Sequence, residues 1–153
     1  MKIRLVSVGR ERPGELTAPL VEEYRARVAR FAELELTELR AESGPQAKER
    51  EAEALLAVHA KQKGASELWA LDELGGQLTS PQLAERVGRA RDRAASLTLC
   101  IGGDEGLAQS ARDKAQLVWS LSKLTLPHKL ARVVVLEQLY RAFEILRGSP
   151  YHK

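Results

Sequence analysis

The stretch Leu97-Thr98-Leu99-Cys100-Ile101-Gly102-Gly103-Asp104-Glu105-Gly106-Leu107 decides the fold. Five apolar or β-branched residues run directly into three glycines within five positions. A short apolar run that ends in turn residues is typical of a buried strand in a parallel sheet. Ligands of open α/β sheets bind just beyond such strand ends, where glycines let the backbone approach them closely. A second apolar run that ends in turn residues covers 119–128. We predict that the two stretches build one pocket.

The rest of the chain alternates strand and helix patterns. We predict strands at 2–9, 34–39, 68–72, 97–101 and 117–121, and helices at 19–32, 46–63, 80–94, 109–116 and about 128–147. This order predicts an α/β fold, a single domain over residues 1–153 with a mainly parallel sheet and flanking helices, but it gives no strand order. The last helix is so apolar that we expect a second copy of the protein to cover it.

Charge and composition narrow the class of protein. The chain has 153 residues and a net charge of +3, and residues 112–153 hold eight Lys or Arg against three acidic residues. A basic C-terminal third suggests a bound polyanion, although a solvated basic face fits equally well. Cys100 is the only cysteine, so we expect a buried reduced thiol in a cytoplasmic protein. No apolar run is long enough to span a bilayer, so no membrane partner is expected.

Known motifs exclude several chemistries. The Gly102-Gly103-x-x-Gly106 turn is neither the dinucleotide-binding G-x-G-x-x-G fingerprint nor a P-loop. The three histidines lack metal-ligand spacing, so no metal site is expected. No nucleophile elbow and no paired carboxylates stand out. The residues alone therefore predict an α/β pocket near basic side chains, and nothing more specific.

Several motifs together resemble one family, the pseudouridine N3-methyltransferases of large-subunit rRNA, which are small SPOUT methyltransferases. The resemblance covers essentially the whole chain, and it departs from the family at Asp104, where many relatives have proline. The segment 122–128 and the Pro-Tyr-His ending are specific, whereas the glycine turn is not. The motifs are the strand 5–9, Leu71-Asp72, Ile101-Gly102-Gly103-Asp104-Glu105-Gly106, Ser120-Leu121-Ser122-Lys123-Leu124-Thr125-Leu126-Pro127-His128, the segment 132–142 and Pro150-Tyr151-His152.

The resemblance implies a C-terminal trefoil knot, a homodimer and S-adenosylmethionine as methyl donor, without a metal. No spacing rule predicts the knot, because threaded chains are nearly absent among folds. The resemblance also implies which residues bind the cofactor, through backbone groups and apolar side chains around the adenine. The cofactor-binding residues implied are Leu71, Gly102, Gly103, Ser122, Lys123, Leu124, Thr125, Leu126 and Pro127.

The implied reaction methylates N3 of a pseudouridine in 23S rRNA, on assembled ribosomes. That nitrogen carries a proton near neutral pH, and His152 is our candidate base. Tyr151 would stack on or hydrogen-bond the base, and Arg141 would steady a phosphate or the imide oxygen. The alternatives are a disordered tail for Tyr151-His152 and an i,i+4 ion pair of Arg141 with Glu137. Phosphate contacts are expected from Lys123, Lys129, Arg132 and Lys153.

Two other classes of protein fit the same pattern. One is a non-catalytic RNA- or ribosome-binding module that has kept the fold, and the other is a small nucleotide-binding α/β enzyme. Binding of S-adenosylmethionine would separate the methyltransferase from both.

Overall fold

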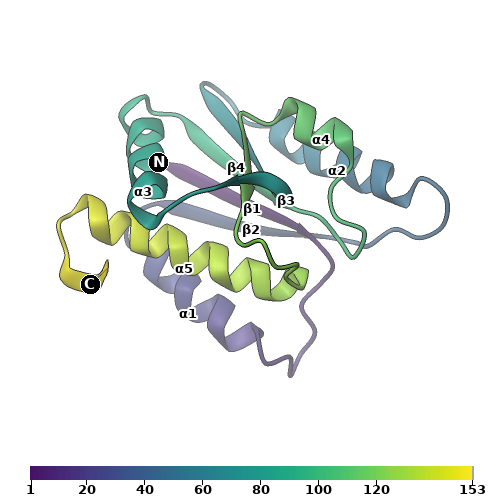
Figure 1. The fold of residues 1–153 in the computed structure, drawn as a ribbon, viewed down its shortest axis with the longest axis horizontal. Coiled ribbons are helices and arrows are strands. Elements are labelled where there is room, and N and C mark those ends of the chain that lie inside the picture. Colours follow the sequence, from purple (N-terminus) through teal and green to yellow (C-terminus); the bar gives the residue numbers. More distant parts are fainter. Residues whose placement is uncertain (153) are drawn as a thin grey trace.

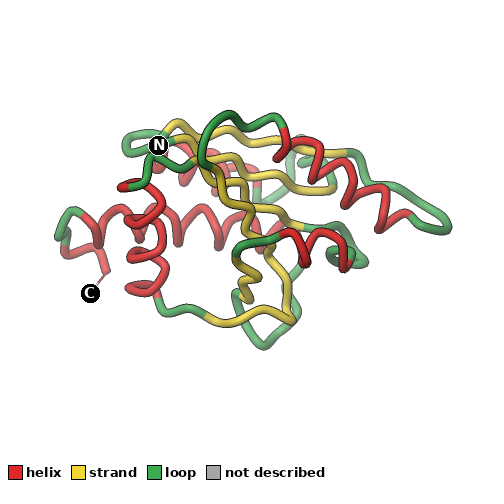
Figure 2. The backbone as a smooth tube through the Cα atoms, turned by 90° about the horizontal axis from the view of Figure 1, so that it is seen from above, coloured by secondary structure: helices red, strands yellow, loops and turns green. Residues whose placement is uncertain are grey.

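The computed structural model describes residues 1–152, apart from the side chain of His152. Five parallel strands form one sheet in the order β2-β1-β4-β3-β5. Figure 2 shows the twist that is usual for such a sheet. The strands are β1 Lys2–Val8, β2 Glu33–Leu39, β3 Ser66–Gln77, β4 Ser96–Ile101 and β5 Leu117–Ser120.

Helices cover both faces of the sheet (Figure 1). One hydrophobic core lies between the sheet and α1, α3 and α5, and a second lies between the sheet and α2 and α4. The helices are α1 Ala18–Val28, α2 Ala47–Ala60, α3 Ser80–Asp92, α4 Gln109–Lys114 and α5 His128–Leu146, followed by the 3₁₀ helix η1 Pro150–His152. Within the described residues, no helix has the length and apolarity needed to cross a membrane.

Strand β4 is the centre of the molecule, as its sequence predicted. It pairs with β1 on one side and β3 on the other, and all six of its residues are buried. Leu97, Leu99 and Ile101 face the core under α5, whereas Cys100 faces the opposite core. Burial raises the pKa of the Cys100 thiol to about 12, which keeps it protonated at neutral pH.

The predicted elements are confirmed, but several boundaries differ, and α2 ends at Ala60 instead of residue 63. Strand β3 runs past Asp72 to Gln77, because Gly75 passes so close to β5 that a Cβ there would lie 2.5 Å from the carbonyl oxygen of Val118. Helix α1 ends at Val28 instead of residue 32. Helix α3 ends at Asp92, and Ala94 is exposed with a positive φ of 52° instead of lying on the inner face of the helix.

We expected a second copy of the protein to cover the last helix because that helix is so apolar, and this reason is wrong. Helices α1 and α3 pack against α5 on one face of the sheet, so a single chain already buries most of its apolar side chains. Leu139 is fully buried and Phe143 is 3% exposed. A second copy is therefore not needed to bury this helix, and any case for a dimer must come from other features.

Replacing Leu139 with alanine should destabilise the single chain. The lost burial and the remaining cavity should lower the free energy of unfolding by about 2–5 kcal/mol, as measured by urea denaturation. Leu130 is 42% exposed on the same helix, so Leu130→Ala is the matched control and should change stability little. Equal losses for the two variants would contradict the burial described above.

Candidate functional site

A cavity of about 700 Å³ lies beyond the carboxyl ends of β3, β4 and β5. Its walls come from the end of β3 at 71–74, the β4–α4 loop at 101–107, and the segment from β5 into α5 at 119–131. The two stretches that the sequence singled out therefore do build one pocket. Its volume falls within the range that is usual for small-molecule sites.

Nearly all the predicted cofactor-binding residues line this cavity. Lys123 is the exception, and its exposed side chain lies on the segment that forms one wall. The predicted residues that line the cavity are Leu71, Gly102, Gly103, Ser122, Leu124, Thr125, Leu126 and Pro127.

The glycines are required by the loop itself. A Cβ on Gly102 would lie 2.5 Å from the carbonyl carbon of Gly106, because the loop folds back and the Gly106 amide donates to the Gly103 oxygen at 3.0 Å. A Cβ on Gly103 would meet Val8 Cγ1 at 3.0 Å and the Glu51 carboxylate at 3.2 Å. The sequence suggested close approach of a ligand, but packing within the protein already excludes a side chain at Gly102 and allows one at Gly103 only if Val8 or Glu51 shifts.

An ion pair that the sequence analysis missed lines one wall of the cavity. Arg112 on α4 donates to Asp72 Oδ2 at 2.9 Å and to the Leu107 carbonyl at 2.8 Å. The Asp72 and Arg112 side chains are 7% and 16% exposed. This pair ties the β4–α4 loop to the end of β3. The strand-end position of Asp72 was a usable signal, whereas nothing local in the sequence pointed to Arg112.

Hydrogen bonds shape the segment between β5 and α5. Ser120 Oγ donates to the Ser122 carbonyl at 2.8 Å, and the Leu124 amide donates to Ser122 Oγ at 3.0 Å. Thr125 Oγ1 donates to Glu73 Oε2 at 2.9 Å, which links this segment to the extension of β3. The cavity wall is thus held by polar contacts on two sides.

The first turn of α5 is fastened to two loops. His128 Nδ1 lies 3.2 Å from Asp104 Oδ1, and its ring fills the place where Gly9 would carry a side chain, at a φ of +91°. Lys129 pairs with Glu15 and, with further hydrogen bonds, lowers the pKa of that carboxyl to about 2. Asp104, the departure from the family pattern, therefore holds the glycine loop to α5.

Arg132 is buried, so it is not a phosphate contact as we expected. Its side chain is 2% exposed, and its Nη2 donates to Ser7 Oγ at 2.7 Å and to the Gly9 carbonyl at 3.1 Å. Its Nη1 donates to Glu38 at 2.5 Å and to Glu11 at 3.1 Å. Arg132 connects α5 to β1, to β2 and to the loop after β1.

The predicted catalytic residues lie far from the cavity of their own chain. Arg141 follows His128 by thirteen residues on α5, which corresponds to about 20 Å at the usual helical rise. Tyr151 packs beside this part of α5, with its hydroxyl 3.4 Å from Glu137 Oε1, and the C-terminus is at the opposite end of α5 from the cavity (Figure 1). The side chain of His152 lies outside the described residues. One chain therefore does not bring Arg141 and Tyr151 to the predicted cofactor site.

Arg141 and Tyr151 form a cluster of their own with Glu137 and Tyr140. Arg141 pairs with Glu137 at 2.5 Å, which raises the pKa of Arg141, so the alternative ion pair is present. The Tyr151 ring packs edge-on against Tyr140 with a centroid distance of 4.8 Å, and Arg141 lies 4.9 Å from its centroid. Burial raises the pKa of Tyr151. The tail is thus anchored at Tyr151, whereas its sequence showed no core-forming pattern.

Among the residues that the structure describes, no group of three or more His, Cys, Asp or Glu side chains could hold a metal ion. The acidic and basic groups that line the cavity are instead paired with one another or exposed at its rim.

Replacing Gly102 with alanine should disrupt the glycine loop and weaken binding of S-adenosylmethionine, the ligand implied by the sequence. The added methyl group must displace backbone at 2.5 Å, so calorimetry should show a loss of about tenfold or more. Gly76→Ala is the matched control, because a Cβ at Gly76 meets nothing within 4 Å. Unchanged affinity in a folded Gly102→Ala protein would show that this loop is not part of the site.

The Lys129–Glu15 pair predicts a dependence of stability on pH. Because the pKa of Glu15 is lowered to about 2, its contribution is complete above the ordinary value of 4.5 and is lost as the pH falls toward 2. The melting temperature of wild type should therefore exceed that of Glu15→Gln above pH 5, and the two curves should converge near pH 2. Parallel curves over this range would argue against the pair.

Comparison with known proteins identifies the family. The family model described as "Predicted SPOUT methyltransferase" matches residues 1–152. Proteins named "Ribosomal RNA large subunit methyltransferase H" are 47% identical in Anaeromyxobacter sp. (strain Fw109-5) and 41% identical in Coxiella burnetii, and each match covers 100% of both chains.

Solved structures agree at the level of the fold. The Legionella pneumophila methyltransferase Lpg2936, solved with its cofactor SAM, superposes with a TM-score of 0.54 at 13% identity, over 93% of this chain and 66% of that one. A Bordetella pertussis protein named as a probable methyltransferase gives 0.58 at 16% identity, over 92% and 95%. These neighbours imply the knotted fold that the resemblance led us to expect, and the chain belongs to the SPOUT methyltransferase family.

Proposed function

We propose that this chain transfers the methyl group of S-adenosylmethionine to N3 of a pseudouridine in 23S rRNA, as one SPOUT domain and in the cytoplasm. The cavity at the strand ends carries the proposal, because the stretches 97–107 and 119–128 meet there, as the pattern of residues predicted. The names of full-length relatives support large-subunit rRNA as the substrate. Specificity for the pseudouridine nitrogen comes from the family resemblance.

The cavity fits S-adenosylmethionine in size, polarity and charge. Leu71, Ile101 and Trp119 give it an apolar wall for the adenine, and the glycine loop leaves backbone groups free of side-chain cover. Glu73 and Asp104 supply negative charge near a ligand whose sulfur is positive. When bound, this cofactor supplies an electrophilic methyl carbon, so the protein has to hold the acceptor nitrogen in line with it.

The acceptor must lose its N3 proton, and we propose that His152 takes it while Arg141 and Tyr151 hold the base. Arg141 lies about 15 Å along α5 from Ala131, the last residue of this helix that lines the cavity, and Tyr151 packs beside Arg141. We therefore infer that they act in the cavity of a partner copy, and that the enzyme is a homodimer. We infer the dimer from the distance between these residues and the cavity. It no longer rests on the apolar side chains of α5, because a single chain buries most of them.

Exposed leucines offer a surface for that dimer. Leu16 and Leu20 at the start of α1 are 91% and 48% exposed, and Leu130 in the first turn of α5 is 42% exposed. The Lys129–Glu15 pair joins residues adjacent to Leu16 and Leu130, which brings both to one side of the molecule. A symmetric contact through this surface would let each α5 extend toward the other copy.

The exposed Lys123 is our remaining candidate for a phosphate contact at the rim of the cavity. Lys129 is engaged by Glu15, Arg132 is buried, and Lys153 lies outside the described residues. The primary test is calorimetry with S-adenosylmethionine, followed by methyl transfer to ribosomes and to naked rRNA. A non-catalytic binding module would bind ribosomes without transferring methyl groups.

Mixing two inactive variants should restore activity if the site is shared between copies. Gly102→Ala damages the cavity, and deletion of residues 151–153 removes the proposed base, so each alone should lose about a hundredfold in rate. In a 1:1 mixture with free subunit exchange, half the dimers hold one intact site. Methyl transfer should therefore recover to about a quarter of wild type.

His152→Ala replaces the truncation as a milder variant, because deleting Tyr151 also removes its contact with Tyr140. If folded, dimeric variants fail to complement each other, the residues act within one chain or not at all.

A further inference from the structure

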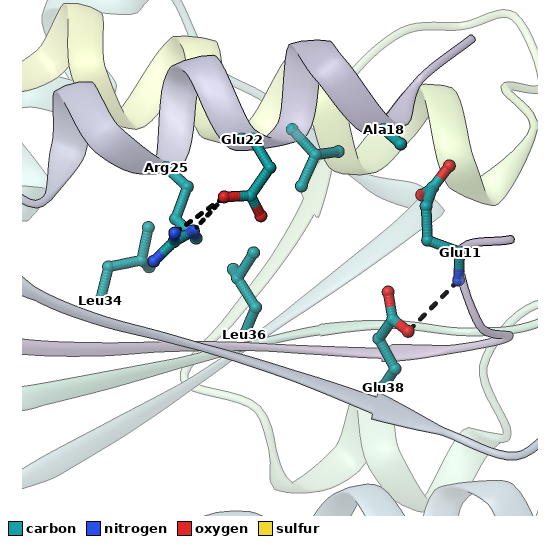
Figure 3. A pocket seen from close by; sticks show the side chains of 8 residues that line it. Glu11, Ala18, Glu22, Arg25, Leu34, Leu36 and Glu38 are labelled. Carbon is teal, nitrogen blue, oxygen red and sulfur yellow. Dashed lines mark hydrogen bonds and ion pairs between the residues drawn. The ribbon is translucent and has the colours of Figure 1, made fainter. Parts of the chain in front are cut away.

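A second cavity, separate from the proposed cofactor site, lies between α1 and the edge strand β2 (Figure 3). We call it the β2 groove, and its volume is about 490 Å³. Its floor is apolar, and its rim holds three carboxylates and one guanidinium. It is lined by Ala18, Val21, Leu34 and Leu36, with Glu11, Glu22, Glu38 and Arg25 around them.

The backbone of β2 has one free edge beside this groove. Within the described sheet, β2 pairs only with β1. The Glu33 amide donates to the Met1 carbonyl and the Leu39 carbonyl accepts from Gly9, so residues 33, 35, 37 and 39 face β1. Because successive residues of a strand point their backbone groups to opposite sides, those of Leu34, Leu36 and Glu38 point outward.

The same three residues direct their side chains into the groove. Figure 3 shows Leu34, Leu36 and Glu38 pointing toward α1. An extended segment that pairs with the outward backbone of these residues would therefore place every second side chain of its own in the groove. Strand addition at a sheet edge with pockets for alternate side chains is a known mode of peptide recognition.

The charge and shape of the β2 groove indicate which side chains a bound segment would carry. The three carboxylates of the rim are already ion-paired, Glu22 with Arg25 at 2.7 Å (Figure 3) and Glu11 and Glu38 with the single guanidinium of Arg132. Three carboxylates against two guanidiniums still leave an excess of negative charge, so a lysine or arginine side chain that packs its aliphatic stem on Leu34 and Leu36 would bring its cation to this rim. The same excess of negative charge disfavours the phosphates of a nucleic acid. A second copy pairing through β2 is disfavoured as well, since it would bring together two strands whose charged residues are all glutamates, Glu33, Glu35 and Glu38.

We propose that the β2 groove binds a basic, extended peptide segment of a protein partner as a sixth strand. This inference does not rest on methyl transfer, because the groove and the cofactor cavity are lined by different residues. A ribosome-directed enzyme with such a groove would have a protein contact in addition to its RNA contacts.

The test uses a capped heptapeptide of alternating lysine and threonine and the full-length protein. Binding should protect the outward amides of Leu34, Leu36 and Glu38 from hydrogen exchange, whereas those of residues 33, 35 and 37 are already bonded to β1. An otherwise identical peptide of alternating glutamate and threonine should not bind. No binding of the basic peptide at millimolar concentration, or binding without protection of these amides, would overturn the proposal.

Two neighbouring carboxylates on α1 give a matched pair of variants. Glu22 lines the groove, whereas Glu23 pairs with Arg27 and does not line it. Glu22→Gln should weaken the peptide by about two- to fivefold, and Glu23→Gln should not. Equal losses would indicate unspecific attraction and contradict the proposal.

Two further measurements test peptide binding independently of the proposed methyl transfer. Binding of S-adenosylmethionine should be the same in both variants, so a failed methyltransferase assay and a failed peptide assay remain distinguishable. Protection of the outward amides that rises with protein concentration, without peptide, would assign the groove to a second copy instead and overturn the proposal.

Discussion

The buried guanidinium of Arg132 holds the cofactor side of the molecule together. A charged group that is 2% exposed needs partners for its hydrogen bonds, and here Ser7, Gly9, Glu11 and Glu38 hold both Nη atoms from three segments, while the buried Nε has no hydrogen-bond partner among the described residues. Breaking one side of a buried charge pair usually costs about 3–5 kcal/mol. The start of α5 is therefore fixed relative to β1 and β2. This also fixes the position of the cavity wall that leads into α5.

Hydrophobic patterning predicted the elements because β4 buries a continuous apolar run and β2 alternates between apolar and polar residues, and both patterns are typical of strands. The buried strand at 97–101 and the glycine turn after it located the cavity correctly, since parallel strands bring their carboxyl ends to one edge. Patterning did not give the order β2-β1-β4-β3-β5, because strands buried on both faces look alike whichever neighbour they have. It also overestimated how much of α5 remained uncovered, since the packing of α1 and α3 on it is a tertiary property.

The candidate site was predictable in part for a similar reason. Residues that follow strands, such as Leu71 and Gly102, are brought to the cavity by the sheet itself. Arg112 reaches the cavity from a helix, and its hydrogen bond to Asp72 joins residues that are 40 positions apart in the sequence. No local pattern could therefore predict it. The ring contact of Tyr151 with Tyr140 is likewise tertiary. Resemblance named Arg141 and Tyr151, but only the length of α5 reveals how far they are from the cavity of their own chain.

The contact of Asp104 with His128 changes how the glycine loop is ordered. A proline at position 104, which the family resemblance leads us to expect, would restrict the loop in the unfolded chain as well and so reduce the entropy lost on folding. Aspartate leaves the unfolded loop with its full freedom, and the contact with the imidazole forms only in the native state. This contact therefore adds to the order of the loop only where α5 is packed, whereas the Gly106–Gly103 hydrogen bond and the contact of Arg112 with the Leu107 carbonyl order the loop without α5.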